Sequence, residues 1–262
     1  MSNEHGMTFM LHTRLDRQEV TDQRRGLPQP PLEMTVPESA KRITLPAAAS
    51  LPAYPCDLTA AISSRRSVRE YAETPLSIEE LTYLLWCTQG LHHTMRAATL
   101  RSVPSAGARH PFETFLLINR VSGLQPGLYR YLALSHELVE LNLDARLTEN
   151  LVTACAEQRF VSKSAVTFFW VAVPARTTWR YGNRGFRYIH LDAGHICQNL
   201  YLAAQAIDCG CCALAAFHDD MLNQALGVDG ENAFVTYVAP LGKRRQPSGS
   251  VGPSTAPPLP RS

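Results

Sequence analysis

The sequence lacks the long apolar run that a membrane span or a secretory signal requires. Its first 20 residues, MSNEHGMTFMLHTRLDRQEV, are mixed in polarity, so we expect a cytoplasmic protein with no membrane anchor. A strong excess of charge is missing too. The 25 Lys and Arg residues against 23 Asp and Glu leave a net charge of +2, which gives no reason to expect a nucleic-acid partner.

Three common catalytic or nucleotide-binding motifs are also missing. The chain has no G-x-x-x-x-G-K-[ST] phosphate loop, no G-x-G-x-x-G turn after a strand and no G-x-S-x-G nucleophile elbow. Their absence argues against a P-loop enzyme, a Rossmann dinucleotide site and an α/β-hydrolase. The seven cysteines are odd in number, which argues against a disulfide framework in a chain of this size. We expect reduced thiols.

Prolines gather at the two ends of the 262-residue chain. Proline breaks regular elements, so residues 1–56 are predicted to form an extended Pro-rich arm and residues 245–262 a disordered tail. Residues 57–244 remain for one globular domain, which is long enough to bury a large core or two small ones.

Periodicity and capping signals predict the elements of this domain. Asp57 can cap a first helix to about residue 66, and Ser77 with Glu80 forms a capping box for a second. Further helices are predicted at 147–158, 185–207 and 219–226, and strands at 113–119, 128–132, 138–141, 165–173 and 233–241. The helix at 185–207 is apolar on most faces, apart from a polar stripe of Asp192, His195 and Asn199, so we expect both its sides to be covered. Helices and strands do not alternate regularly, which favours the α+β class.

Three short segments carry groups that suit a ligand. Residues 64–69 (SRRSVR) hold three guanidinium groups that could bind phosphate, or form a solvated basic helix end. Residues 104–111 (PSAGARHP) could let the backbone approach a flat ligand, or form an ordinary loop. Residues 180–187 (RYGNRGFR) could line a site in a loop between strand and long helix, or merely cap that helix.

A fourth segment, Cys209-Gly210-Cys211-Cys212 with His218 after it, invites comparison with zinc sites. Adjacent cysteines on a strand point to opposite faces and cannot converge on one ion. We therefore predict buried thiols and no metal.

In their order along the chain, these motifs resemble a known family. Arg65-Arg66-Ser67-x-Arg69, the Pro104–Ala108 segment, Gly127-Leu128-Tyr129-Arg130-Tyr131 and Asp192-Ala-Gly-His195-x-x-Gln198-Asn199-Leu200 are similar to the motifs of SagB-type dehydrogenases, within the FMN-dependent nitroreductase superfamily. The resemblance implies a nitroreductase-like α+β fold: a central mixed or antiparallel sheet flanked by helices, in an entwined homodimer. The long helix would be the dimer helix, and the terminal arms would wrap the partner.

The same resemblance implies where FMN would be held. Arg65, Arg66, Ser67 and Arg69 would hold the flavin, with Arg69 at the pyrimidine edge of its ring. Pro104, Ser105, Ala106, Gly107 and Ala108 would approach the same flavin from the other protomer. The backbone of Cys212, Ala213, Leu214 and Ala215 would line the ring, and Lys243 and Arg244 would assist at the phosphate.

The reaction is the open part of the interpretation. SagB-type enzymes include oxidases that turn azolines in peptides into azoles, with a Lys-Tyr pair associated with proton removal. Here the corresponding pair is Arg180-Tyr181, and an arginine stays protonated in proteins, so Arg180 could bind an anion but not act as the base. Three hypotheses follow: a dehydrogenase or azole-forming oxidase acting on a small or peptide-borne substrate, an NAD(P)H-dependent nitro or quinone reductase, or a flavin-binding scaffold subunit without turnover.

Overall fold

A central antiparallel sheet organises the computed structural model, which describes residues 4–17, 19–95 and 97–245. Its strands are β1 (Arg42–Thr44), β4 (Phe112–Ile118), β5 (Gly127–Leu132), β6 (Glu137–Asn142), β7 (Val166–Ala172), β8 (Cys209–Cys211) and β9 (Phe234–Lys243). They lie in the order β1-β6-β5-β4-β7-β9-β8, with every neighbouring pair antiparallel. A separate hairpin joins β2 (Leu91–Met95) to β3 (Ala98–Arg101). The predicted α+β class is confirmed.

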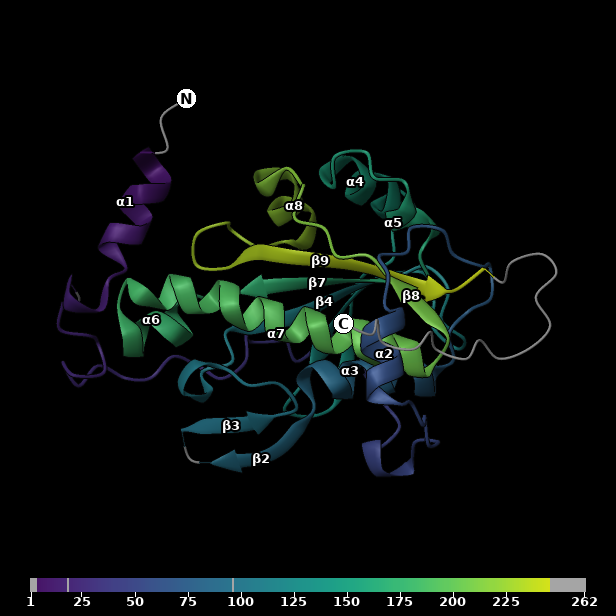
Figure 1. Cartoon of the computed structure of the whole chain (residues 1–262), viewed down its shortest axis with the longest axis horizontal. Coiled ribbons are helices and arrows are strands. Elements are labelled where there is room, and N and C mark those ends of the chain that lie inside the picture. Colours follow the sequence, from purple (N-terminus) through teal and green to yellow (C-terminus); the bar gives the residue numbers. More distant parts are fainter. Residues whose placement is uncertain (1–3, 18, 96, 246–262) are drawn as a thin grey trace, which may run out of the picture.

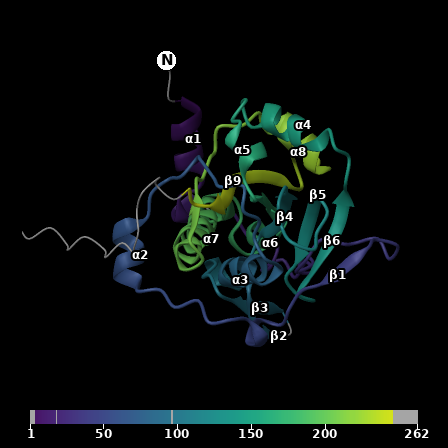
Figure 2. The same ribbon diagram turned by 90° about the vertical axis from the view of Figure 1, so that its right-hand side faces the viewer.

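Helices cover both faces of the sheet. They are α1 (Glu4–His12), α2 (Leu58–Ser64), α3 (Ile78–Gln89), α4 (Leu147–Ala154), α5 (Phe160–Lys163), α6 (Ala175–Tyr181), α7 (Arg184–Ala206) and α8 (Asp219–Leu226). Figures 1 and 2 show α3 and α7 on one face and α4, α5 and α8 on the other.

Two hydrophobic cores follow from this arrangement. Successive residues of a strand point to opposite faces, so Phe168 and Trp170 of β7 pack in the core beneath α3 and α7. Phe169 and Val171 pack in the core beneath α4 and α8. Every residue of β4 and β7 is buried, which explains why β7 is almost wholly apolar in the sequence, whereas the buried Glu113 of β4 is paired with Arg176.

The local signals for helix ends are confirmed. The Asp57 side chain accepts a hydrogen bond from the Ala60 backbone at 2.7 Å and caps α2. Ser77 and Glu80 form the complete capping box of α3. Gly227 ends α8 in the left-handed conformation, with φ of 73°. The predicted hairpin forms as β5 and β6.

The N-terminal arm is not extended throughout, in contrast to the prediction. It contains a helix, α1, and a strand, β1, which joins the edge of the sheet by pairing with β6. It also binds its own domain: Arg176 donates to the Pro31 carbonyl at 2.8 Å, and Arg130 donates to the Met34 carbonyl at 2.9 Å. Buried arginines beneath the arm therefore hold it on its own chain. The predicted tail lies outside the described residues from residue 246 onward.

Two further predictions need correction. Arg180 and Tyr181 lie in a short helix, α6, and not in a loop. β9 continues two residues beyond Leu241, so Lys243 ends the strand instead of following it. Within the single chain one face of α7 is open, since Leu191, Gly194 and Gln198 are exposed, so the predicted cover on that face would have to come from a partner. No described helix is long and apolar enough to cross a bilayer.

Candidate functional site

The Arg65–Arg69 segment, the first motif of the sequence, lies against β8. Ser67 pairs with Cys211 in a parallel bridge, and the Val68 amide donates to the Cys211 carbonyl at 2.9 Å. Gly210 permits this approach, because a Cβ atom at that position would lie 2.5 Å from the Val68 Cβ. The fold thus places the Arg65–Arg69 segment next to the Cys212–Ala215 segment, as the resemblance implied.

Tyr201 of α7 ties these two segments together. Its hydroxyl lies 3.2 Å from the Ser67 hydroxyl and accepts a hydrogen bond from the Ala213 amide at 2.7 Å. The Arg65 guanidinium stands over its ring at 5.3 Å. Sequence reasoning missed this residue, although a tyrosine within a repeat of aliphatic residues is a signal, since a buried phenol needs a polar partner.

The arginines of this motif form no ion pair with a carboxylate of the described residues. Arg66 donates to the Ser63 and Arg65 carbonyls at 2.9 and 2.8 Å and so closes the end of α2. Arg65 and Arg69 make no such main-chain bonds among those recorded. Burial raises the pKa of the Cys212 thiol and the Arg69 charge opposes that rise, while the Arg69 guanidinium lies over the Phe160 ring at 5.9 Å.

The two basic residues near the end of β9, Lys243 and Arg244, bind different partners. Lys243 binds the Glu80 carboxylate and donates to the Ile207 carbonyl at 2.8 Å, so its charge is already compensated. Arg244 donates to the Cys209 carbonyl at 3.1 Å and binds the side-chain oxygen of Gln205. The Ser64 hydroxyl reaches that same oxygen at 3.4 Å, so Arg244 lies at the end of α2, beside the first motif.

The Pro104–Ala108 segment is held on the other side of α7. The Ser105 hydroxyl donates to the Asp192 carboxylate at 2.6 Å, and the Ala106 amide lies 3.3 Å from it. Burial raises the pKa of Asp192, and its bonds from Ser105 and Ala106 partly offset the rise. Two residues of the polar stripe predicted on this helix therefore attach neighbouring segments to it: Asp192 binds Ser105 and Ala106, and Asn199 donates to the Cys87 carbonyl at 2.9 Å. The third, His195, is exposed.

Gly107 is the point where the Pro104–Ala108 segment contacts Arg180 and Tyr181. It has a φ of 59°, and a Cβ atom on it would lie 2.4 Å from the Tyr181 hydroxyl and 3.2 Å from the Arg180 side chain. Only glycine fits both the left-handed conformation and this contact. Tyr181, which packs edge-on against Tyr188 at 4.9 Å, thus stands at the surface of the Pro104–Ala108 segment.

Within one chain the predicted site residues lie in two separate clusters, which we call half-sites because the predicted flavin site would combine them across a dimer. The first contains Arg65, Ser67, Arg69, Arg244 and the Cys212–Ala215 backbone, anchored at Tyr201; the second contains the Pro104–Ala108 segment with Arg180 and Tyr181, anchored at Asp192. Asp192 and Tyr201 are nine residues apart, which places them about 14 Å apart along α7 and on opposite sides of it. A single chain therefore does not bring the two half-sites together.

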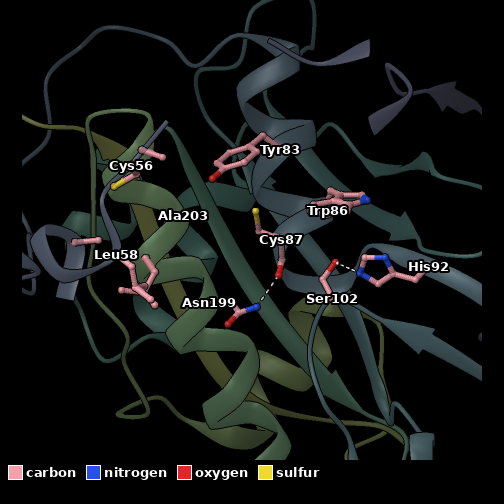
Figure 3. Close-up of a pocket in the computed structure, with 12 residues that line it drawn as sticks. Cys56, Leu58, Tyr83, Trp86, Cys87, His92, Ser102, Asn199 and Ala203 are labelled. Atoms are coloured by element: carbon pink, nitrogen blue, oxygen red, sulfur yellow. Dashed lines mark hydrogen bonds between the residues drawn. The ribbon is translucent and has the colours of Figure 1, made fainter. Parts of the chain in front are cut away.

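A hollow of about 360 Å³ lies between α2, α3 and α7, and none of the predicted site residues lines it. Figure 3 shows the side chains around it. Cys56 and Leu58 lie on one side of it, Tyr83 and Trp86 on the other. Its lining includes no Arg, Lys, Asp or Glu, so it offers no fixed charge for a phosphate. The first half-site is the better place for an anionic cofactor.

The cysteine-rich segment forms β8, with Cys209, Cys211 and Cys212 buried. Burial raises the pKa of Cys209 to about 12, which keeps its thiol protonated at neutral pH. In the part of the chain that the structure describes, no three His, Cys, Asp or Glu side chains are placed to hold a metal ion.

Comparison with known proteins gives the family. The sequence profile of the nitroreductase family matches residues 62–243. A protein of Methanocaldococcus jannaschii named as a nitroreductase is 33% identical over 180 residues, which are 69% of this chain and 87% of that protein. The trifolitoxin-processing protein TfxB of Rhizobium leguminosarum bv. trifolii is 31% identical over 111 residues, 41% of this chain and 30% of its own length.

A solved structure from Anabaena variabilis, also described as a nitroreductase, is similar with a TM-score of 0.67 and 28% identity. The similarity covers 79% of this chain and 42% of that one, so the chain spans less than half of two of these three relatives. The match of the family profile to residues 62–243 includes α7, every strand of the central sheet except β1, and both half-sites apart from Arg244. The chain belongs to the nitroreductase family.

Proposed function

We propose that this chain is an FMN-dependent oxidoreductase of the SagB type, active as a homodimer. It would transfer a hydride between a small or peptide-borne substrate and FMN. The observation that carries this proposal is the first half-site, where Arg65 and Arg69 stand without a carboxylate partner among the described residues. Uncompensated guanidinium groups beside an accessible backbone suit a flat, phosphate-bearing ligand.

The residues present fit FMN. Arg65 follows α2 directly, and Arg244 lies beside the same helix end through the shared Gln205 oxygen, so both could supply positive charge for a phosphate dianion, whereas Lys243 is neutralised by Glu80. Arg69 adds a further positive charge, which acts on the buried Cys212 thiol while its guanidinium packs over the Phe160 ring at 5.9 Å. Bound FMN would supply the hydride chemistry, and the chain would orient the cofactor and tune it by hydrogen bonds.

The exposed face of α7 supports the homodimer. Gly194 lies at the middle of this helix, and nothing stands within 4 Å of the position of its Cβ. A mid-helix glycine costs about 1 kcal/mol relative to alanine, so the open position needs another reason, such as close approach of a second helix. A two-fold axis near Gly194 would bring the first half-site of one protomer to the second half-site of the other.

Arg180 and Tyr181 would then stand at the substrate side of the cofactor. The Tyr181 hydroxyl, held against Gly107, can donate or accept a proton at the reacting group, and Arg180 supplies a fixed positive charge beside it. A peptide-borne azoline is one substrate that this arrangement suits. The similarity to TfxB, whose name describes the processing of trifolitoxin, supports a peptide substrate.

A second candidate is an NAD(P)H-dependent nitro or quinone reductase. It is favoured by the similarity to the Methanocaldococcus jannaschii protein, of which this chain covers 87%. The two functions differ in what reduces the flavin. Anaerobic mixing with NADH, NADPH or a thiazoline peptide, followed at the flavin absorbance band, separates them, since bleaching by a nicotinamide alone identifies the reductase. Bound FMN that nothing reduces would indicate the scaffold subunit.

The cofactor is tested first. The purified protein should be yellow and release FMN, not FAD, on denaturation. Arg65→Ala and Arg69→Ala should each lose FMN while keeping the far-UV spectrum and the unfolding cooperativity of the parent. Arg42→Ala, which removes an exposed arginine paired with Glu137 at the β1 edge of the sheet, opposite β8, is the matched control and should keep FMN. A protein that takes up no FMN would end the proposal.

A further inference from the structure

A cavity of about 520 Å³ lies beside the second half-site, between the N-terminal arm and α6. Arg180, Tyr181 and Arg184 line it from the α6–α7 side. Leu15, Glu19, Thr21, Gln23 and Arg24 line it from the arm. Its volume is in the range of small-molecule sites, and Tyr181 connects it to the place where the proposed reaction occurs.

The arm is fastened where it forms this wall. The Gln23 amide donates to the Trp179 carbonyl at 2.9 Å, and the Trp179 indole donates to the Leu27 carbonyl at 2.9 Å. Arg184 donates to the Thr13 carbonyl at 2.9 Å, and Arg187 donates to the Thr13 hydroxyl at 2.6 Å. These bonds on both sides of the wall hold the cavity in a defined shape.

The lining of the cavity is positively charged. It holds three arginines, at positions 24, 180 and 184, against one carboxylate, that of Glu19. Arg184 already donates to the Tyr188 hydroxyl and the Thr13 carbonyl. Arg24 and Arg180 are exposed to the cavity and form no recorded ion pair with a described carboxylate. Arg109 contributes to the same positive region, because Arg180 lowers its pKa as a neighbouring like charge, after the larger effect of burial.

We propose that this cavity binds the carboxylate of the substrate, with Arg24 and Arg180 as its anchors and Tyr181 facing the reacting end. The inference rests on the proposed function and names the substrate class for it. A guanidinium fork matches a carboxylate in a two-bond geometry. The N-terminal arm, which the family profile does not include, would thereby determine specificity. Another anion, the 2′-phosphate of NADPH, could meet the same charges and is separated below.

The test compares two probes of equal shape, 4-nitrobenzoate and the neutral 4-nitrobenzamide, by isothermal titration calorimetry with the full-length purified protein. The carboxylate should bind roughly tenfold or more tightly than the amide, since hydrogen bonds between charged groups have that magnitude. Arg24→Gln and Arg180→Gln should each remove most of this preference. Arg25→Gln is the matched control, because Arg25 is adjacent in sequence but faces Asp22 at 3.9 Å and does not line the cavity.

Three results would overturn the inference. These are equal affinity for the two probes, an equal loss in Arg25→Gln, or variants that weaken NADPH but not NADH or the benzoate, which would assign the cavity to the nicotinamide phosphate. FMN content is measured separately on the same samples. A protein with FMN but no preference refutes only the carboxylate site, whereas a protein without FMN refutes the proposed function, and the heat of probe binding is measured in either case.

Discussion

Gly194 offers the sharpest test of the proposed dimer, because its substitution has opposite effects in a lone protomer and in a pair. In the chain as described, nothing lies within 4 Å of a Cβ at this position. Leucine is a far better helix former than glycine, so Gly194→Leu should raise the unfolding free energy of an isolated protomer by somewhat under 1 kcal/mol.

In a dimer formed across this face the same change should be harmful. Helices that pack through a glycine lie close together, and each inserted side chain would cost about 1–3 kcal/mol. A two-fold interface contains the substitution twice, so association should weaken by about 2–6 kcal/mol. That corresponds to an increase in the dissociation constant of roughly 30-fold to more than 10⁴-fold.

Sedimentation velocity over a concentration series measures this constant, and the flavin absorbance measures the FMN that remains bound. Thr153→Leu is the control, because it adds the same side chain to an exposed position of α4, on the opposite face of the sheet. A Gly194→Leu protein that dimerises as tightly as the parent, or a parent that is monomeric at micromolar concentration, would refute the reasoning.

Three more predictions follow from single contacts. Gly107→Ala should lower the unfolding free energy by more than Gly123→Ala, since both positions have positive φ but only at Gly107 would the Cβ meet another atom, the Tyr181 hydroxyl at 2.4 Å; equal losses in chemical denaturation would contradict this. Tyr201→Phe leaves the Ala213 amide without its partner and should cost about 1–3 kcal/mol and reduce FMN affinity, and an unchanged FMN dissociation constant would remove Tyr201 from the site. Burial, with the charge of Arg101, lowers the pKa of His110 to about 3 from 6.5. Between these two pH values the unfolded chain binds a proton on His110 and the folded protein does not. Stability from this group is present above about pH 6.5 and should fall on acidification by up to about 1.4 kcal/mol per pH unit, and His110→Gln should be flatter from pH 6 to 4; parallel curves would show that His110 does not titrate in this way.

Much of the fold was predictable because its signals are local. The Asp57 cap of α2, the Ser77–Glu80 capping box and the strand β7 depend on residues close in sequence, and each appeared as expected. The N-terminal arm was not predictable in this way. Its prolines indicated an extended segment, but β1 forms because the edge of β6 is free to pair with it. Arg130 and Arg176 also bind the arm, and they lie about 100 to 145 positions further along the chain than the arm residues that they contact.

The features of the candidate site also divide into those set by neighbouring residues and those set by contacts between distant segments. The sequence by itself determined the charged and small segments, their order and their resemblance to the nitroreductase superfamily, because these depend on residue types and spacing. Only the tertiary structure decided that Lys243 is neutralised by Glu80, that Tyr201 joins Ser67 to Ala213, and that the motifs lie in two separate clusters within the chain. These facts depend on which side chains meet across α7 and β8, and contacts between distant segments leave no periodicity in the chain.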